Sequence, residues 1–131
     1  MPIVPKLNDE QLSPQAQAVF ADIRATRKNE YVNDFWRVLA NDPPQLEQVW
    51  QQAKQVMAAG ALDAVTKELI YIAVSIANNC EYCINTHTAA ARGKGLTDTQ
   101  HSEFMRVIAL ASTTNRLAIG FQVPTDAKFK M

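Results

Sequence analysis

The sequence contains little sulfur and has no excess of charge of either sign. Lysine and arginine together number 13, aspartate and glutamate also number 13, and the formal net charge is zero. The two signs are interleaved and no basic stripe forms, which argues against a surface for nucleic acid or for an anionic membrane. We therefore expect neither nucleic acid nor a membrane among the partners.

Long hydrophobic runs are also missing. The longest, LIYIAVSIA at residues 69–77, is about half of the ~18–20 residues needed to cross a bilayer. The first ten residues, MPIVPKLNDE, lack the charged segment and apolar run of a secretory signal. We expect a cytoplasmic protein, in which a pair of cysteines more often serves catalysis, redox sensing or metal binding than a structural disulfide.

Hydrophobic residues are plentiful, at 47% of the 131 positions. This composition supports a sizeable core, and the length is near that of one domain. No internal repeat, low-complexity stretch or linker divides the chain, so we expect a single domain over residues 1–131.

Helix signals are strong along the whole sequence and strand signals are weak. Apolar residues at three- and four-residue steps, preceded by capping residues or prolines, predict an all-α fold. The second half of the fourth helix is apolar nearly all round, which predicts a buried central helix packed against the helix that follows. A loose tail is expected from residue 125. The expected helices cover residues 16–27, 34–39, 44–60, 64–77, 80–93 and 97–121.

Both cysteines and a histidine lie on one stretch, in the pattern C-x-x-C-x-x-x-H. On a helix, the side chains of Cys80, Cys83 and His87 point within about 60° of one another. Cys80 lies near the amino end, where free N–H groups and the helix dipole favour a thiolate. Cys83 and His87 are one turn apart. The helix therefore presents two thiols that can bridge, with a base beside them.

Glu68 joins this group only if the chain reverses between the fourth and fifth helices. If the chain turns back at Asn78 and Asn79, Glu68 and His87 lie at nearly the same height of an antiparallel pair. The carboxylate could then orient the imidazole and raise its basicity. In one straight helix, Glu68 and Cys80 would be about 18 Å apart, so the relay depends on the turn.

Simpler explanations exist for each of these residues. The cysteines could be small core residues, and Glu68 could be a first-turn glutamate favoured by the helix dipole. A zinc site could use Cys80, Cys83, His87 and His101, although this spacing fits no usual structural zinc pattern. Otherwise His101 is a solvated residue of the sixth helix. The large aromatics Trp36, Trp50 and Phe104 are most simply core or subunit-interface residues.

The segment KELIYIAVSIANNCEYCINTHTAAARGKG, residues 67–95, resembles the core of the alkylhydroperoxidase AhpD-like group in the carboxymuconolactone decarboxylase superfamily. The matching features are Glu68, the Cys80-x-x-Cys83 pair twelve residues later, and His87. The strong likeness covers residues 62–95, about a quarter of the chain. Its combined spacing is specific, whereas a C-x-x-C pair alone would not be.

This resemblance implies an all-α homo-oligomer, a trimer or hexamer, that acts as a thiol-dependent peroxidase with no cofactor or metal. By that similarity, Cys83 attacks the hydroperoxide, Cys80 resolves the sulfenic acid to a disulfide, and Glu68 and His87 relay the proton. A dithiol reductant, such as a lipoyl-bearing or thioredoxin-like protein, would restore the thiols. The residues alone do not decide which cysteine is the attacking thiolate. The amino end of the helix favours the thiolate of Cys80, and the imidazole one turn away favours that of Cys83. We take Cys83 as the attacking residue.

One position departs from the best-known peroxidases of the group, which carry a histidine where this chain has Tyr82. A phenol is not a base at neutral pH, although it can donate a hydrogen bond, so Tyr82 is expected only to support the site. The lyase branch of the superfamily is a less suitable comparison, because a redox pair has no role in decarboxylation.

A competing hypothesis is a non-catalytic redox sensor or an oligomeric interaction protein that uses the same dithiol. An enzyme would consume many equivalents of peroxide and a sensor about one, so turnover distinguishes the two.

Overall fold

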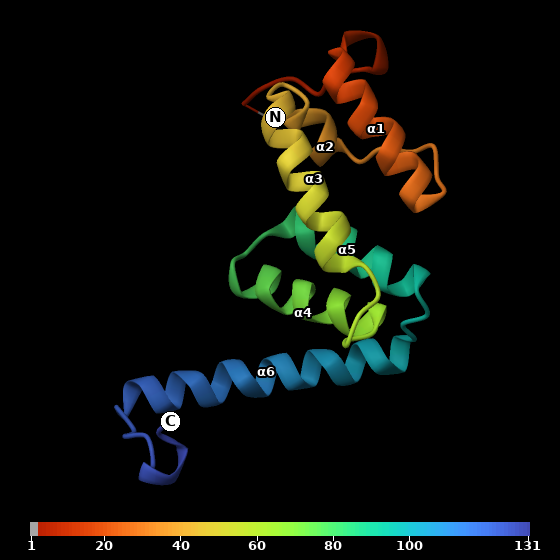
Figure 1. Ribbon diagram of the computed structural model, residues 1–131. Helices are drawn as coiled ribbons and strands as arrows, with labels where there is room; N and C mark the ends of the chain where they lie inside the picture. The colour runs from red at the N-terminus through yellow and green to blue at the C-terminus, as the bar shows by residue number, and fades with distance from the viewer. Residues whose placement is uncertain (1–2) are drawn as a thin grey trace. The chain divides into compact units, whose positions relative to one another are not determined.

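The computed structural model describes residues 3–131, and within them it contains helices and no strand (Figure 1). The predicted all-α fold is confirmed, with six α-helices close to their expected ranges. A short 3₁₀ helix, Ala127–Phe129, lies in the tail that was expected to be loose. The α-helices are α1 Pro14–Arg27, α2 Asp34–Leu39, α3 Pro43–Met57, α4 Ala64–Ala77, α5 Glu81–Gly93 and α6 Asp98–Gly120.

Side-chain caps explain where four of these helices begin. In each case an oxygen of the capping residue accepts an N–H from the first turn, which satisfies a donor that the helix itself leaves unpaired. α6 has a full capping box, in which Gln100 also accepts the N–H of Thr97. The caps are Ser13 for α1, Asp42 for α3, Asp63 for α4 and Thr97 for α6.

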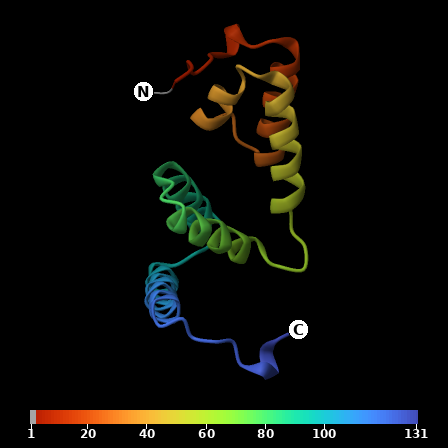
Figure 2. The same ribbon diagram turned by 90° about the vertical axis from the view of Figure 1, so that its left-hand side faces the viewer.

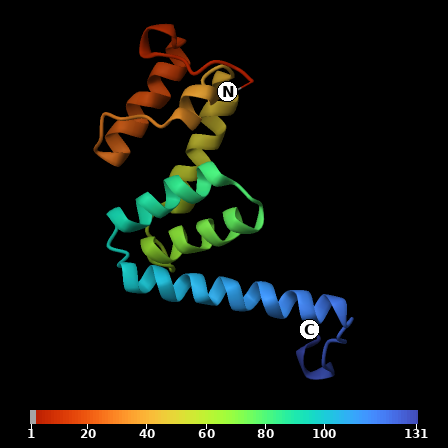
Figure 3. The same ribbon diagram turned by 180° about the vertical axis from the view of Figure 1, so that it is seen from behind.

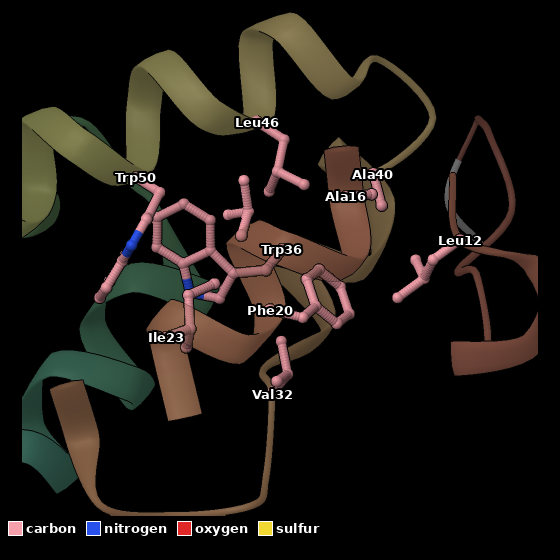
Figure 4. Packing of buried hydrophobic residues seen from close by; sticks show 10 residues of the cluster. Leu12, Ala16, Phe20, Ile23, Val32, Trp36, Ala40, Leu46 and Trp50 are labelled. Atoms are coloured by element: carbon pink, nitrogen blue, oxygen red, sulfur yellow. The ribbon is translucent and has the colours of Figure 1, made fainter. Parts of the chain in front are cut away.

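The chain forms two compact units, one ending at Ala58 and the other beginning at Ala59. That the two make up one domain stays a prediction. In the first unit α1 and α3 lie side by side (Figure 2), and the short α2 contributes Trp36. The apolar faces of these helices meet in one core (Figure 4). The core residues are Leu12, Ala16, Val19, Phe20, Ile23, Val32, Trp36, Ala40, Leu46 and Trp50.

Two tryptophans anchor this core. The rings of Trp36 and Trp50 meet edge to face with their centroids 5.5 Å apart, and the Arg27 guanidinium lies over both rings. The indole N–H of Trp50 donates to Asp22 at 2.7 Å, so the one polar atom of the ring is satisfied. Both tryptophans are therefore core residues, as their helical spacing allowed.

The second unit is built on an antiparallel pair, α4 and α5, which lie side by side (Figure 3). Ile72 of α4 and Ala91 of α5 are buried together with Leu96, which follows α5. Two polar residues, Glu68 and Ser75, are buried in α4 as well, and α6 has no buried residue. The buried surface here is small and partly polar.

The prediction that the cysteine helix packs on the helix before it is confirmed. In the second half of α4, expected to be buried, Ile72 and Ser75 are buried while Tyr71 and Val74 are exposed within the single chain. The physical reason is that α5 covers one side of α4 and leaves an apolar side uncovered. Of the helices that the structure describes, none is both long and apolar enough to cross a membrane.

Candidate active site

The turn between α4 and α5 forms at Asn78 and Asn79, the predicted break. Asn79 has φ 56°, the left-handed conformation that asparagine tolerates better than most residues. The N–H of Asn79 donates to the carbonyl of Ile76, and that of Cys80 to the carbonyl of Ser75. This pair of bonds is a Schellman motif, which satisfies the last carbonyls of α4. The motif reverses the direction of the chain, so that Cys80 lies directly before α5.

Cys80 is the N-cap of α5, and its Sγ accepts the N–H of Cys83 at 3.3 Å. The two cysteines form a disulfide, with their Cα atoms 5.3 Å apart. Both cysteines are half-buried, and neither belongs to the core of the first unit or to the buried apolar residues of the second. The alternative of two small core residues is therefore wrong. The sulfurs lie at the amino end of α5, where the helix stabilises negative charge.

The turn brings Glu68 of α4 to His87 of α5, with Oε2 2.7 Å from Nδ1. Glu68 is 3% exposed and lies beyond the first turn of α4, so it is not a first-turn glutamate favoured by the helix dipole. An ionised carboxylate only accepts hydrogen bonds, so Nδ1 must be the donor. The lone pair of the neutral imidazole then lies on Nε2, the nitrogen that faces away from Glu68. The contact thus fixes which nitrogen of His87 can act as a base.

Lys94, which the sequence reasoning missed, completes the environment of Glu68. Its Nζ lies 2.6 Å from Oε1, the carboxylate oxygen that His87 does not use. Lys94 is the C-cap of α5, and Gly95 follows it with φ 107°. The N–H groups of Gly95 and Leu96 donate to the carbonyls of Arg92 and Ala91 in a second Schellman motif. The glycine-rich end and its lysine were the available signal.

The charge of Glu68 follows from these two contacts. Burial by itself raises the pKa of the Glu68 carboxyl, but hydrogen bonds from His87 and Lys94, with the charge of each, outweigh burial. The pKa therefore lies below its ordinary value, and Glu68 is ionised at neutral pH.

Tyr71 is a second neighbour that the sequence reasoning missed. Its ring stacks on the imidazole of His87, with centroids 3.6 Å apart and planes 21° apart. Tyr71 is one turn after Glu68 on α4, so both residues lie on the same face of that helix. Glu68 accepts the N–H at the edge of the imidazole, and Tyr71 covers one flat side of the ring. His87 is therefore fixed in both tautomer and ring plane.

The remaining candidates lie outside this cluster. Tyr82 sits between the cysteines in the first turn of α5 and is exposed. His101 is on α6, where its ring neighbours Phe104. In residues 3–131, no three side chains of the His, Cys, Asp and Glu types are grouped so as to hold a metal ion.

The sequence profile of the carboxymuconolactone decarboxylase family matches residues 44–126, more than half of the chain. The crystal structure of an alkylhydroperoxidase AhpD core from Rhodospirillum rubrum superposes with a TM-score of 0.96. That protein is 52% identical, and the likeness covers 98% of this chain and 97% of the other. Fold and sequence thus agree along almost the whole chain.

Curated relatives are similar over different lengths. Alkyl hydroperoxide reductase AhpD of Solibacter usitatus is 30% identical over 129 residues, which is 93% of this chain and 71% of that protein. An uncharacterized protein of the cox locus of Paracoccus denitrificans is 44% identical over 57 residues. This match covers 44% of this chain and 51% of the length of that protein. The chain belongs to the carboxymuconolactone decarboxylase family, as one of its alkylhydroperoxidase AhpD-like members.

Proposed function

We propose that the chain is a thiol-dependent peroxidase that reduces hydroperoxides through Cys80 and Cys83. The observation that carries the proposal is a cysteine pair within disulfide range on the same helix hairpin as a buried carboxylate–imidazole pair. The names of the AhpD relatives point the same way. A redox-active pair needs the sulfurs close together and accessible, and both cysteines are half-buried.

The oxidative half of the reaction uses both thiols. The Cys83 thiolate attacks the terminal oxygen of the hydroperoxide, the O–O bond breaks, and the rest of the peroxide leaves as an alcohol after taking up a proton. Cys83 is then a sulfenic acid. The Cys80 thiolate attacks that sulfur, hydroxide leaves and becomes water with one proton, and the disulfide forms. One hydroperoxide and two thiols give one alcohol, one water and one disulfide.

In this proposal Glu68 and His87 move the proton. Nε2 of His87 takes the thiol proton of Cys83, directly or through water, and returns it to the leaving alcohol. Glu68 stabilises the imidazolium that forms in between, because its carboxylate already accepts the Nδ1–H. Tyr82 can donate a hydrogen bond beside the cysteines.

A dithiol reductant, such as a lipoyl-bearing or thioredoxin-like protein, completes the cycle. Its thiolate attacks the Cys83 sulfur and forms a mixed disulfide, and Cys80 leaves as a thiolate. The Cys83 N–H that points at the Cys80 sulfur stabilises that leaving group. The second thiol of the reductant then attacks the mixed disulfide and releases Cys83.

The test is consumption of cumene hydroperoxide and hydrogen peroxide by the reduced protein with excess dihydrolipoamide, followed by intact mass. We expect many turnovers and, once the reductant is exhausted, a loss of two hydrogens. Cys83→Ser should abolish consumption, and Cys80→Ser, assayed without the reductant, should stop after about one equivalent. Tyr31→Ala, an exposed change in the first unit, serves as the control.

Each outcome separates this proposal from another. Undiminished consumption by Cys83→Ser would refute Cys83 as the attacking residue. One equivalent consumed by the parent, without turnover, would favour a redox sensor. Inertness toward both peroxides would refute the peroxidase proposal and leave a lyase or interaction protein to be tested.

We also propose a cytoplasmic homo-oligomer, a trimer or hexamer. Large apolar side chains are exposed on α4 and along α6, and a second copy of the chain could cover them. Among them are Ile70, Val74, Val107, Leu110, Leu117 and Ile119. Size-exclusion chromatography with light scattering tests this proposal, and a monomer at micromolar concentration would refute it.

A further inference from the structure

Glu68 is a buried carboxylate with a hydrogen-bond donor at each oxygen: the imidazole of His87 at one and the ammonium of Lys94 at the other. Nδ1 of His87 lies at Oε2 and Nζ of Lys94 lies at Oε1, at 2.7 and 2.6 Å. Both partners come from α5, one from its middle and one from its end. Lys94 is in direct contact with Glu68, which in turn accepts from His87, so an effect of Lys94 on the imidazole can pass through Glu68.

We propose that Lys94 is a positioning residue, which acts through Glu68 to keep Nε2 of His87 free of a proton and available as a base. This inference rests on the proposed function, because it assigns Lys94 a part in the same proton relay. The chemistry it predicts at His87 can nevertheless be measured without any peroxide.

Counting protons on the Glu68–His87 pair explains the effect. With one proton, the pair is an ionised carboxylate and a neutral imidazole that carries its hydrogen on Nδ1, so Nε2 is free. A second proton can make either an imidazolium or a carboxylic acid that donates to Nδ1. In both of these forms Nε2 carries a hydrogen, whichever residue the proton is assigned to. The base exists only in the form with one proton.

Lys94 favours that form electrostatically. A cation in contact with Oε1 stabilises the state of the pair with the lower positive charge, which is the one with a single proton. Among the residues that the structure describes, the charged or titratable groups that interact with Glu68 are His87 of α5 and Lys94 at the end of that helix. From α4, His87 is faced by Glu68 and by the phenol ring of Tyr71. Arg92, two residues before Lys94, pairs instead with Asp98 at 3.6 Å.

The backbone holds Lys94 in place. As the C-cap of α5, its N–H donates to the carbonyls of Ala90 and Ala91, and the left-handed Gly95 turns the chain away directly after it. A cation at this position also complements the negative end of the helix dipole. The lysine is therefore part of the helix end rather than a freely moving surface side chain, although 38% of its side chain is exposed.

The test is a pH titration of the imidazole nitrogens by long-range ¹⁵N–¹H NMR on the disulfide form. The chain has two histidines, so the spectrum of His101→Gln assigns the signals of His87. We expect Nε2 to lose its hydrogen about 1 pH unit higher in Lys94→Met than in the parent. Lys94→Arg, which keeps the charge, should restore most of the parent value.

Arg92→Met is the matched control, since it removes one positive charge from the same helix without touching Glu68. We expect it to move the midpoint by less than about 0.3 pH unit, because solvent screens a charge that is not in contact. An unchanged midpoint in Lys94→Met, or an equal shift in Arg92→Met, would overturn the proposal. If Lys94→Met is unfolded by circular dichroism, Lys94→Gln is measured against the same expectation.

Peroxide consumption separates this inference from the proposed function. If both hold, the acid limb of the parent's pH–rate profile shifts upward in Lys94→Met, and Lys94→Arg reverses the shift. A parent without turnover but with the NMR shift would refute the peroxidase while leaving the effect of Lys94 on His87 established. A parent that turns over, with no shift in Lys94→Met, would refute the inference alone.

Discussion

The two units of the chain bury different kinds of residues. The first, up to Ala58, encloses Phe20, Trp36 and Trp50 in a core to which α1, α2 and α3 all contribute. The second buries few apolar side chains and, alongside them, the carboxylate of Glu68. Its longest helix, α6, has no buried residue. One unit is built around hydrophobic burial and the other around a charged, hydrogen-bonded cluster.

This difference indicates how stability and chemistry are divided. Burial of apolar surface stabilises the first unit, and this contribution does not depend on pH. In the second, a buried charge is tolerated because both of its oxygens have cationic or N–H partners, and its contribution depends on protonation. The four predictions below test that division, from the largest expected effect on the free energy of unfolding to the smallest.

Phe20→Ala should destabilise the first unit by about 3–5 kcal/mol, because it empties the centre of a packed core. Urea unfolding followed by circular dichroism measures the loss. The matched control Tyr31→Ala removes an aromatic side chain that is 63% exposed and should change the free energy by no more than about 0.5 kcal/mol. Similar losses for the two variants would contradict the assigned core.

Glu68→Gln should cost about 1–3 kcal/mol at neutral pH, because it removes charge-assisted hydrogen bonds to His87 and Lys94. Since the pKa of Glu68 is lowered on folding, its stabilisation is present above the ordinary value of 4.5 and is lost as pH falls through the folded value.

The measurement is urea unfolding of parent and Glu68→Gln at several pH values between 3 and 7. The difference between them should be largest near neutrality and shrink as the pH falls below 4.5, the ordinary pKa of the carboxyl. A difference that stays constant over this range would mean that Glu68 contributes by packing and not by charge.

Gly95→Ala should cost about 1 kcal/mol, because an L-residue is strained at φ 107° even though no atom would clash with the added Cβ. Gly93→Ala is the control: Gly93 is the last residue of α5, has helical backbone and open surroundings, so alanine should stabilise the helix by about 0.5–1 kcal/mol. Thermal unfolding of the two variants should therefore shift in opposite directions. Shifts of the same sign would disprove the second Schellman motif.

Lys54→Met in the first unit should change stability by less than about 1 kcal/mol, since its ion pair with Asp22 is partly exposed. Salt should weaken what little this pair contributes. A loss comparable to that of Glu68→Gln would show that charge pairs matter equally in both units. The contrast between the units would then fail.

The positions of the helices could be predicted from the sequence because their determinants are local. Ser13, Asp42, Asp63 and Thr97 cap the helices that follow them, and apolar spacing defines the faces. The reversal at Asn79 was foreseen as a break. That both cysteines and His87 share one face of α5 stays a prediction from the C-x-x-C-x-x-x-H spacing. Gly95, which follows the C-cap of α5, has the positive φ that glycine adopts without steric cost.

Tertiary structure decided what surrounds these residues. Tyr71 and Lys94 reach His87 and Glu68 only because α4 and α5 pack antiparallel, and Lys94 depends further on the turn at Gly95. The exposure of α4 was also unforeseen, since periodicity reports that a face is apolar but not which surface covers it. Helix caps and spacing are set by neighbours within a few residues. A carboxylate's charge and an imidazole's tautomer are set by groups that meet only in the folded chain.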